Sequence, residues 1–188
     1  HIPPRGLMQI KRFAIAAALL MAAALPLSAQ TTVSMGAGGG GSPHQKTTWT
    51  VNGATISIAY GRPYLKGRAD SVMMPAGTPW RTGADQATVI TSDKPLTFGN
   101  VVLAPGSYTI NTEPGAGGWQ LILGTLASPG QWGIPYQPKL ELGRAPMTLG
   151  RTSSPVEQVT FSIDPGPTPT LRLEWGRVSA TVPFRVGS

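Results

Sequence analysis

The dipeptide Asn52-Gly53 lies between two stretches in which apolar and polar residues alternate. Both central positions of a type I′ turn need a positive φ, which Asn and Gly adopt at low cost, so this dipeptide predicts a tight β-hairpin. Pairing across the turn sets Trp49 opposite Ile56 and puts the bulky side chains on one face. The chain is therefore expected to contain an antiparallel strand pair over residues 47–60.

Two other glycines pass the same pairing test. One turn is expected at Gly99-Asn100 and one at Gly176-Arg177, the latter with Trp175 opposite Val178. No stretch has the pattern of a long amphipathic helix, and the best helical candidate is a short turn near residues 71–74.

Several short alternating stretches joined by frequent turns are typical of an all-β protein. The 40% hydrophobic content and five Trp allow a packed core despite 24 Gly and 19 Pro. We expect an antiparallel β-sandwich or jelly roll with roughly nine strands and little helix. At 188 residues one domain is expected, and we place a single β-sandwich domain at residues 44–186. The Pro/Gly-rich segment 125–154 is too long for a plain connection and either wraps a sheet edge or lines a site.

The first residues have the three parts of a secretory signal peptide. Two basic residues after Met8 precede an apolar run over 13–25, and small residues follow up to Ala29. This run is shorter than the roughly 18 residues that a membrane-spanning helix needs. We expect a periplasmic or secreted protein with no stable membrane insertion after cleavage. The assigned segments are upstream or non-native residues 1–7, a signal peptide at 8–29 and a Gly-rich flexible leader at 30–43.

Charge and residue usage exclude several functions. Signal removal takes away Arg5, Lys11 and Arg12 and no acidic residue, so the net charge falls from +7 to +4. This small excess is spread along the chain and argues against nucleic acid as a partner. The absence of cysteine excludes disulfides, thiolate catalysis and Cys-ligated zinc. We predict no metal and no cofactor, with a calcium ion held by oxygen atoms as the open alternative.

Five blocks of the sequence occur in the order and approximate spacing of one family of secreted bacterial proteins. They are SPHQ at 42–45, YGRPYLKGR at 60–68, WRTGADQAT at 80–88, APGSYTI at 104–110 and QWG at 131–133. From about residue 42 to residue 184 the chain resembles domain-of-unknown-function family 2911. The resemblance implies little about activity, because the family is known by its sequence and not by an established reaction.

The third block departs from the family pattern. Its usual form resembles WRTGANEAT, whereas this chain has Asp85-Gln86 in place of Asn-Glu. If an acidic side chain is needed at the second of these positions, its loss puts shared carboxylate chemistry in doubt.

Two of the blocks carry cations and aromatic side chains in loops next to strand ends. If both loops meet at one end of the sandwich, three arginines can form an anion site and two aromatic rings can stack on the ligand. The alternative is a latch, in which one arginine pairs with Asp85 and holds its loop in place. His44, the one histidine of the mature chain, either ties the start of the fold to a neighbouring loop or serves proton transfer or metal binding. The predicted ligand-binding residues are His44, Arg62, Tyr64, Arg68, Trp80, Arg81 and Asp85.

These residues favour an exported, non-catalytic β-domain of unknown role, with a loop-end pocket for a small anionic or sugar-like ligand. One alternative is a periplasmic hydrolase that uses His44, Asp85 and Arg81 to stabilise an oxyanion or a phosphate. Another is a structural envelope or interaction protein whose Pro/Gly-rich segment docks a partner. No motif gives a positive signal for catalysis, so a binding role is favoured over an enzyme.

Overall fold

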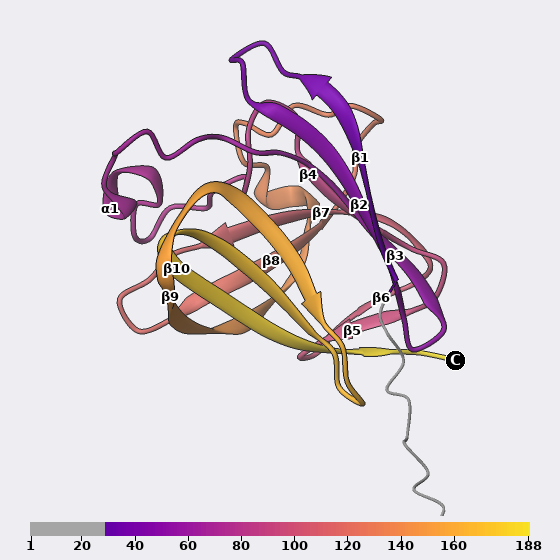
Figure 1. Ribbon diagram of the computed structural model, residues 1–188. Helices are drawn as coiled ribbons and strands as arrows, with labels where there is room; N and C mark the ends of the chain where they lie inside the picture. Colours follow the sequence, from indigo (N-terminus) through magenta and orange to yellow (C-terminus); the bar gives the residue numbers. More distant parts are fainter. Residues whose placement is uncertain (1–28) are drawn as a thin grey trace, which may run out of the picture.

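The computed structural model describes residues 29–188, so the predicted upstream residues and signal peptide, up to residue 28, lie outside the described part. Ten strands form one open sheet in the order β1-β2-β3-β4-β7-β8-β9-β10-β5-β6 (Figure 1). The described helical elements are α1 (Asp70–Met73), where a short helical turn was expected, and the 3-10 turn η1 (Pro138–Leu140). The strands are β1 (Gln30–Ala37), β2 (Pro43–Val51), β3 (Ala54–Gly61), β4 (Thr88–Ser92), β5 (Leu96–Phe98), β6 (Val101–Leu103), β7 (Gly106–Glu113), β8 (Trp119–Thr125), β9 (Glu141–Asp164) and β10 (Thr170–Val186).

The architecture confirms the all-β, antiparallel class and the low helix content. All strand pairs are antiparallel. The expected sandwich or jelly roll is not confirmed, because neighbouring strands are hydrogen-bonded throughout the ten-stranded order. Within residues 29–188, no helix is long and apolar enough to cross a membrane.

Two of the three predicted hairpins are confirmed. Asn52 and Gly53 have φ values of 47° and 78°, as a type I′ turn requires, and Trp49 pairs with Ile56 across β2 and β3. The turn at Gly99-Asn100 joins β5 to β6 with the expected register. Local turn chemistry therefore sets these two pairs.

The third predicted hairpin, at Gly176-Arg177, is wrong. Strand β10 continues through both residues and pairs with β9, and Gly176 lies opposite Val156 where the register shifts. Gly176 has a φ of 58°. A glycine with positive φ suits a β-bulge as well as a tight turn, so the dipeptide alone does not separate the two structures.

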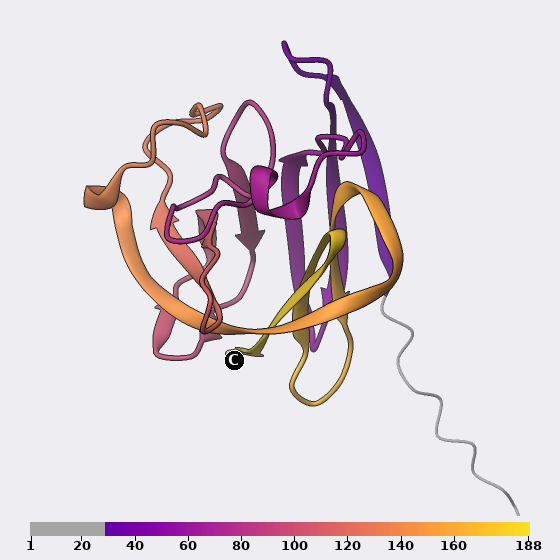
Figure 2. The same cartoon turned by 90° about the vertical axis from the view of Figure 1, so that its left-hand side faces the viewer.

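Strand β9 carries the sheet around the core. Its first residues pair with β8, where Met147 lies opposite Trp119, and the remainder pairs with β10, where Leu149 lies opposite Ala180. Figure 2 shows this strand sweeping in one long curve from the β8 side to the β10 side. About half of the segment 125–154, which was expected to wrap a sheet edge or to line a site, is thus the start of a long strand. Ile134, in the part before this strand, borders the cleft described below.

Residues 30–37 also differ from expectation, because they form β1 and not a flexible leader. This strand pairs with β2, and all of its residues are exposed. Its β-branched residues Thr31, Thr32 and Val33 favour an extended backbone, but its lack of a buried face leaves no hydrophobic alternation to detect.

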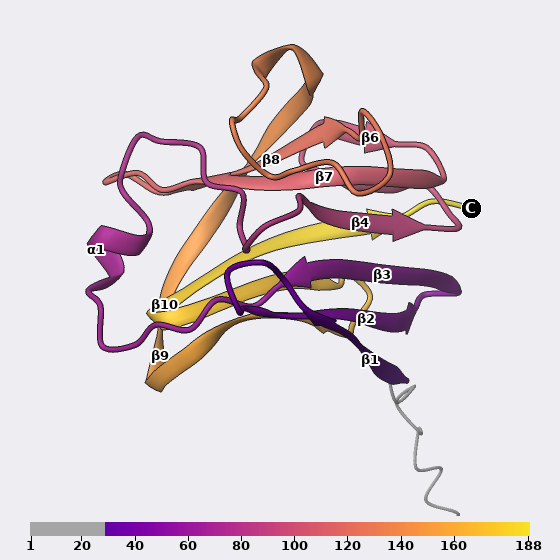
Figure 3. The ribbon, with the colours of Figure 1, turned by 90° about the horizontal axis from the view of Figure 1, so that it is seen from above.

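The core lies on the inner face of the curved sheet. Trp49, Trp119 and Trp175 are buried, as their positions on apolar strand faces predict. The connection from β3 to β4, which includes α1, lies at one end of the strands, and the C terminus lies at the other end (Figure 3). This connection contains the two loops in which ligand-binding residues were predicted.

Candidate functional site

Residues of both predicted loops border one open cleft of about 720 Å³. The turn between β1 and β2 contributes Gly40 and Gly41 to its lining, and β10 contributes Trp175. Two of the predicted residues, His44 and Arg62, do not line the cleft. The five that do are Tyr64, Arg68, Trp80, Arg81 and Asp85.

Arg62 is occupied within the fold. Its Nε donates to the Val159 carbonyl at 2.8 Å, its Nη1 to Gln45 Oε1 at 3.1 Å, and its Nη2 to Thr160 Oγ1 at 2.9 Å. These bonds join the end of β3 to β2 and β9. Because all three nitrogens are used, Arg62 serves to fasten strands and not to meet a ligand.

Arg68 and Arg81 remain uncompensated cations. Arg68 donates to the carbonyl oxygens of Leu65 and Tyr64 at 2.9 and 2.5 Å. Arg81 donates to the carbonyl oxygens of Gly83 and Asp85 at 3.2 and 3.4 Å. The ion pairs found among residues 29–188 include neither arginine. Each guanidinium therefore shapes its own loop and keeps its positive charge available at the cleft.

The latch on Asp85 exists, but its partner is His44 and not an arginine. His44 Nε2 lies 2.9 Å from Asp85 Oδ2, and the two side chains are only 12% and 9% exposed. This contact ties β2 to loop 80–88, in agreement with the expectation that His44 fastens the start of the fold to a neighbouring loop. Arg81 reaches only the backbone oxygen of Asp85.

Glycines allow the backbone to close around this pair. A Cβ at Gly38 would lie 1.8 Å from Asp85 Oδ2, and one at Gly61 would lie 2.5 Å from the Ala84 carbonyl oxygen. The role of these two glycines could not be predicted from the sequence, where their only signal is their place in the glycine run and in the family blocks. Similar close approaches occur at Gly83 and Gly133.

Loop 80–88 holds a strained backbone conformation. Thr82 and Asp85 have φ values of 55° and 61°, and a β-branched residue rarely adopts this region. Thr82 is fully buried, donates to the Trp80 carbonyl at 3.0 Å, and accepts a bond from Thr88 Oγ1 on its own carbonyl at 3.0 Å. Such strain persists where the surroundings fix the backbone, and it is concentrated at functional sites. The loop is thus a rigid support for Arg81 and Asp85.

Aromatic side chains form one wall of the cleft. Trp80 stacks on Trp175 with ring centroids 5.4 Å apart and an interplanar angle of 12°. Trp175 is 1% exposed, and its Nε1 donates to the Glu157 carbonyl at 3.2 Å. Tyr64 is 37% exposed, with Lys66 Nζ 6.0 Å from its ring centroid. The cleft therefore combines a fixed aromatic surface with cationic groups at its rim.

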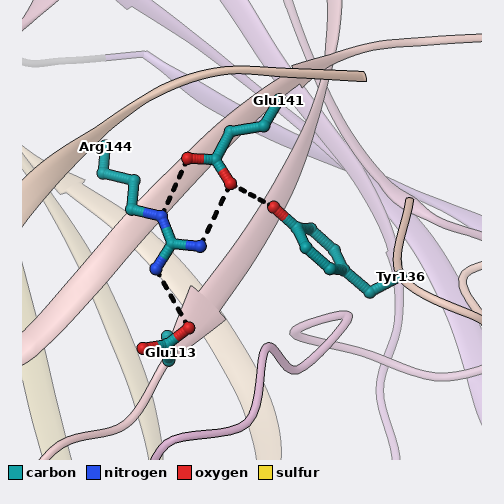
Figure 4. A network of polar contacts seen from close by, with 4 residues as sticks. All are labelled: Glu113, Tyr136, Glu141 and Arg144. Carbon is teal, nitrogen blue, oxygen red and sulfur yellow. Dashed lines mark hydrogen bonds and ion pairs between the residues drawn. The ribbon is translucent and has the colours of Figure 1, made fainter. Parts of the chain in front are cut away.

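Figure 4 shows a second polar network, formed by Glu113, Tyr136, Glu141 and Arg144. Arg144 bonds both carboxylates, and Tyr136 donates its hydroxyl proton to Glu141. The bond from Arg144 lowers the pKa of Glu141, and burial together with Glu141 raises the pKa of Tyr136 to about 12. Tyr136 and Glu141 border a cavity of about 20 Å³, which holds no more than a water molecule. Because these four side chains bond to one another and the cavity beside them is small, we place the candidate site at the cleft of about 720 Å³.

No group of three or more His, Cys, Asp or Glu residues in the part of the chain that the structure describes is arranged to hold a metal ion. His44 and Asp85 form a pair without a third ligand of these types. The arrangement at the cleft thus offers charge, hydrogen-bond acceptors and aromatic surface.

Comparison with known proteins finds one family. The model of the family described as "Protein of unknown function (DUF2911)" matches residues 42–184. Three of the five sequence blocks that carry the resemblance contribute residues to the cleft or to the His44–Asp85 pair. QWG at 131–133 lies against loop 80–88, where the Gly133 N–H donates to the Asp85 carbonyl at 2.9 Å, and APGSYTI at 104–110 contributes to neither. Comparison with curated proteins and with solved structures gives no match.

Proposed function

Because the chain belongs to the DUF2911 family, whose description assigns no activity, we propose a function from the geometry of the cleft: binding of a small anionic ligand after export from the cell. One observation carries this proposal. Lys66, Arg68 and Arg81 border the same open cleft, and none of them forms an ion pair with a carboxylate among residues 29–188. Three unpaired cations next to a low-dielectric aromatic wall attract an anion more strongly than the same charges in open water.

The dimensions and lining of the cleft support this proposal. Its volume of about 720 Å³ lies in the range of small-molecule sites. Asp85, the one carboxylate in the described part of the chain that lines it, has one of its two oxygens bonded to His44. The positive charges therefore outnumber the negative charge. Guanidinium groups suit carboxylate and phosphate oxygens because they donate charge-assisted hydrogen bonds.

We do not extend the proposal to the hydrolase alternative. His44 bonds Asp85 through Nε2 and does not line the cleft, and Arg81 already donates to two carbonyl oxygens. Among residues 29–188, Asp85 is the only carboxylate that borders the cleft, whereas most glycoside hydrolases use two. The observed groups fit recognition better than acid–base chemistry.

Lys66→Gln is expected to weaken binding of a simple anion, such as phosphate or cyclohexanecarboxylate, about 5-fold, because an exposed cation contributes modestly to ion pairing. Fluorescence titration follows binding through Trp80, which lines the cleft. Raising the salt concentration should weaken binding to the wild type as well. Lys139→Gln serves as a matched control, because Lys139 is an exposed lysine outside the cleft. Equal affinities in the two variants, or no binding by the wild type, would contradict the proposed function.

The export part of the proposal is supported by the position of β1. This strand begins at Gln30, directly after the expected cleavage point at Ala29. Intact-mass measurement of protein produced in a bacterium with a secretion pathway is expected to give a chain that begins near Gln30. A chain that keeps Met8 would contradict export by signal cleavage.

A further inference from the structure

We infer that the ligand of the cleft is a hydroxylated carboxylic acid with a saturated ring, the chemistry of a sugar acid; this inference rests on the proposed anion-binding function. Asp85 carries a negative charge that opposes anion binding unless this carboxylate binds a part of the ligand other than its acid group. Asp85 is 6% exposed and lines the cleft together with the three cations. A site built for a bare anion would gain affinity if this carboxylate were absent, because like charges repel.

The two oxygens of Asp85 have different surroundings. Oδ2 is bonded to His44 Nε2 at 2.9 Å, whereas Oδ1 has no hydrogen-bond partner among the described residues. No buried side-chain oxygen or nitrogen in this part of the chain lacks a partner, so Oδ1 is reached by solvent. Gly40 lies beside this oxygen, and a Cβ on it would be in ordinary van der Waals contact with Oδ1 at 3.7 Å. The cleft thus contains one fixed, charged acceptor that is open to a ligand donor.

Hydroxyl groups are the donors that fit this acceptor best. A hydroxyl gains a charge-assisted hydrogen bond to Oδ1 and has no charge of its own. An ammonium group would also bond Asp85, but it would be repelled by Lys66, Arg68 and Arg81. A ligand with an acid group near these cations and hydroxyl groups near Asp85 satisfies both sets of charges.

The aromatic lining of the cleft indicates which part of the ligand joins its acid group to its hydroxyl groups. Tyr64 and Trp80 border the cleft, and Trp80 is held in place by its stacking on Trp175. The C–H face of a pyranose ring packs on such a surface while its hydroxyl groups project from the ring edge. The volume of about 720 Å³ has room for one or two sugar rings.

Three ligands of similar ring size test the inference on the wild-type protein. D-glucuronate has both the acid and the hydroxyl groups, cyclohexanecarboxylate has only the acid, and D-glucose has only the hydroxyl groups. Isothermal titration calorimetry is expected to show that glucuronate binds at least about 10-fold more tightly than either of the others, as one good charge-assisted hydrogen bond allows.

Asp85→Asn provides a test in which the two acids should respond in opposite directions. Asn has the same size and tolerates the positive φ at this position. The loss of charge is expected to weaken glucuronate binding about 10-fold and to tighten cyclohexanecarboxylate binding. A thermal unfolding curve shows whether Asp85→Asn is folded. If this variant does not fold, the three ligands on the wild-type protein alone decide the sugar-acid inference.

The outcomes separate the two proposals. If both acids bind the wild type equally and Asp85→Asn tightens both, the sugar-acid inference is overturned and anion binding stands. If glucose binds as tightly as glucuronate, the acid group of the sugar is not recognised and the sugar-acid inference is overturned, whereas anion binding stands or falls with the phosphate titration. If none of the three ligands binds at about 10 mM, a weak limit for a small ligand, this inference fails, and the phosphate titration decides anion binding separately.

Discussion

Gly61→Ala is expected to lower the free energy of unfolding by about 2–3 kcal/mol, which is large for the addition of one methyl group. The new Cβ would lie 2.5 Å from the Ala84 carbonyl oxygen and 2.8 Å from His44 Nε2. Gly61 cannot retreat, because it pairs with His44 in the ladder between β2 and β3. The backbone of loop 80–88 must therefore move, and this movement also displaces Asp85 from the cleft wall.

Urea denaturation measures the loss of stability, and Gly39→Ala is the matched control. Gly39 lies in the turn between β1 and β2, and a Cβ on it would meet no atom within 4 Å. We expect its replacement to change the free energy of unfolding by less than about 0.5 kcal/mol. Equal stability of the two variants would show that the close packing of β3 against loop 80–88 is not rigid.

The parts of the fold that sequence predicts correctly are those set by neighbouring residues. The hairpin at Asn52-Gly53 is predicted correctly because the backbone preference of this dipeptide and the alternating residues on both sides specify the same structure. The hairpin predicted at Gly176 is wrong because a β-bulge and a tight turn need the same positive φ. The choice between them depends on pairing with β9, which is distant in sequence. Strand β1 has no buried face, so its sequence lacks the alternation that indicates a strand.

The sequence predicts most residues of the candidate site but not the contacts between them. The two loops could be paired from their sequence blocks, and five of the seven proposed residues line one cleft. Which side chain pairs with Asp85 could not be predicted, because the answer depends on the register between β2 and β3 and on close backbone approach at Gly38 and Gly61. Arg62 is predicted as a ligand residue from its place in the loop after a strand end. Its role in fastening strands could not be predicted, because its bonds to Val159 and Thr160 join residues about a hundred positions apart in the sequence.

Trp175→Ala is expected to lower the free energy of unfolding by about 3–5 kcal/mol, the range for removal of a buried aromatic side chain. Trp175 is 1% exposed and supports Trp80 by stacking. Its loss leaves a cavity beneath the aromatic wall and removes the donor to the Glu157 carbonyl. Chemical denaturation measures this effect, and Trp132→Ala is the matched control because Trp132 is 49% exposed. A control of this kind is expected to lose less than about 1 kcal/mol.

Trp175→Phe separates the stability effect from the binding effect. Phenylalanine keeps an aromatic ring beneath Trp80 but lacks the indole N–H, so the loss should be smaller than in Trp175→Ala, at about 1–3 kcal/mol for the smaller ring and the lost hydrogen bond. If the cleft wall depends on the support of Trp80, Trp175→Phe should retain most of the affinity for an acidic ligand under conditions where both variants are folded. Folded Trp175→Ala should then bind more weakly than Trp175→Phe. Equal binding by the two folded variants would mean that Trp80 keeps its position without Trp175, and that the rigidity of the wall comes from the strained loop 80–88 alone.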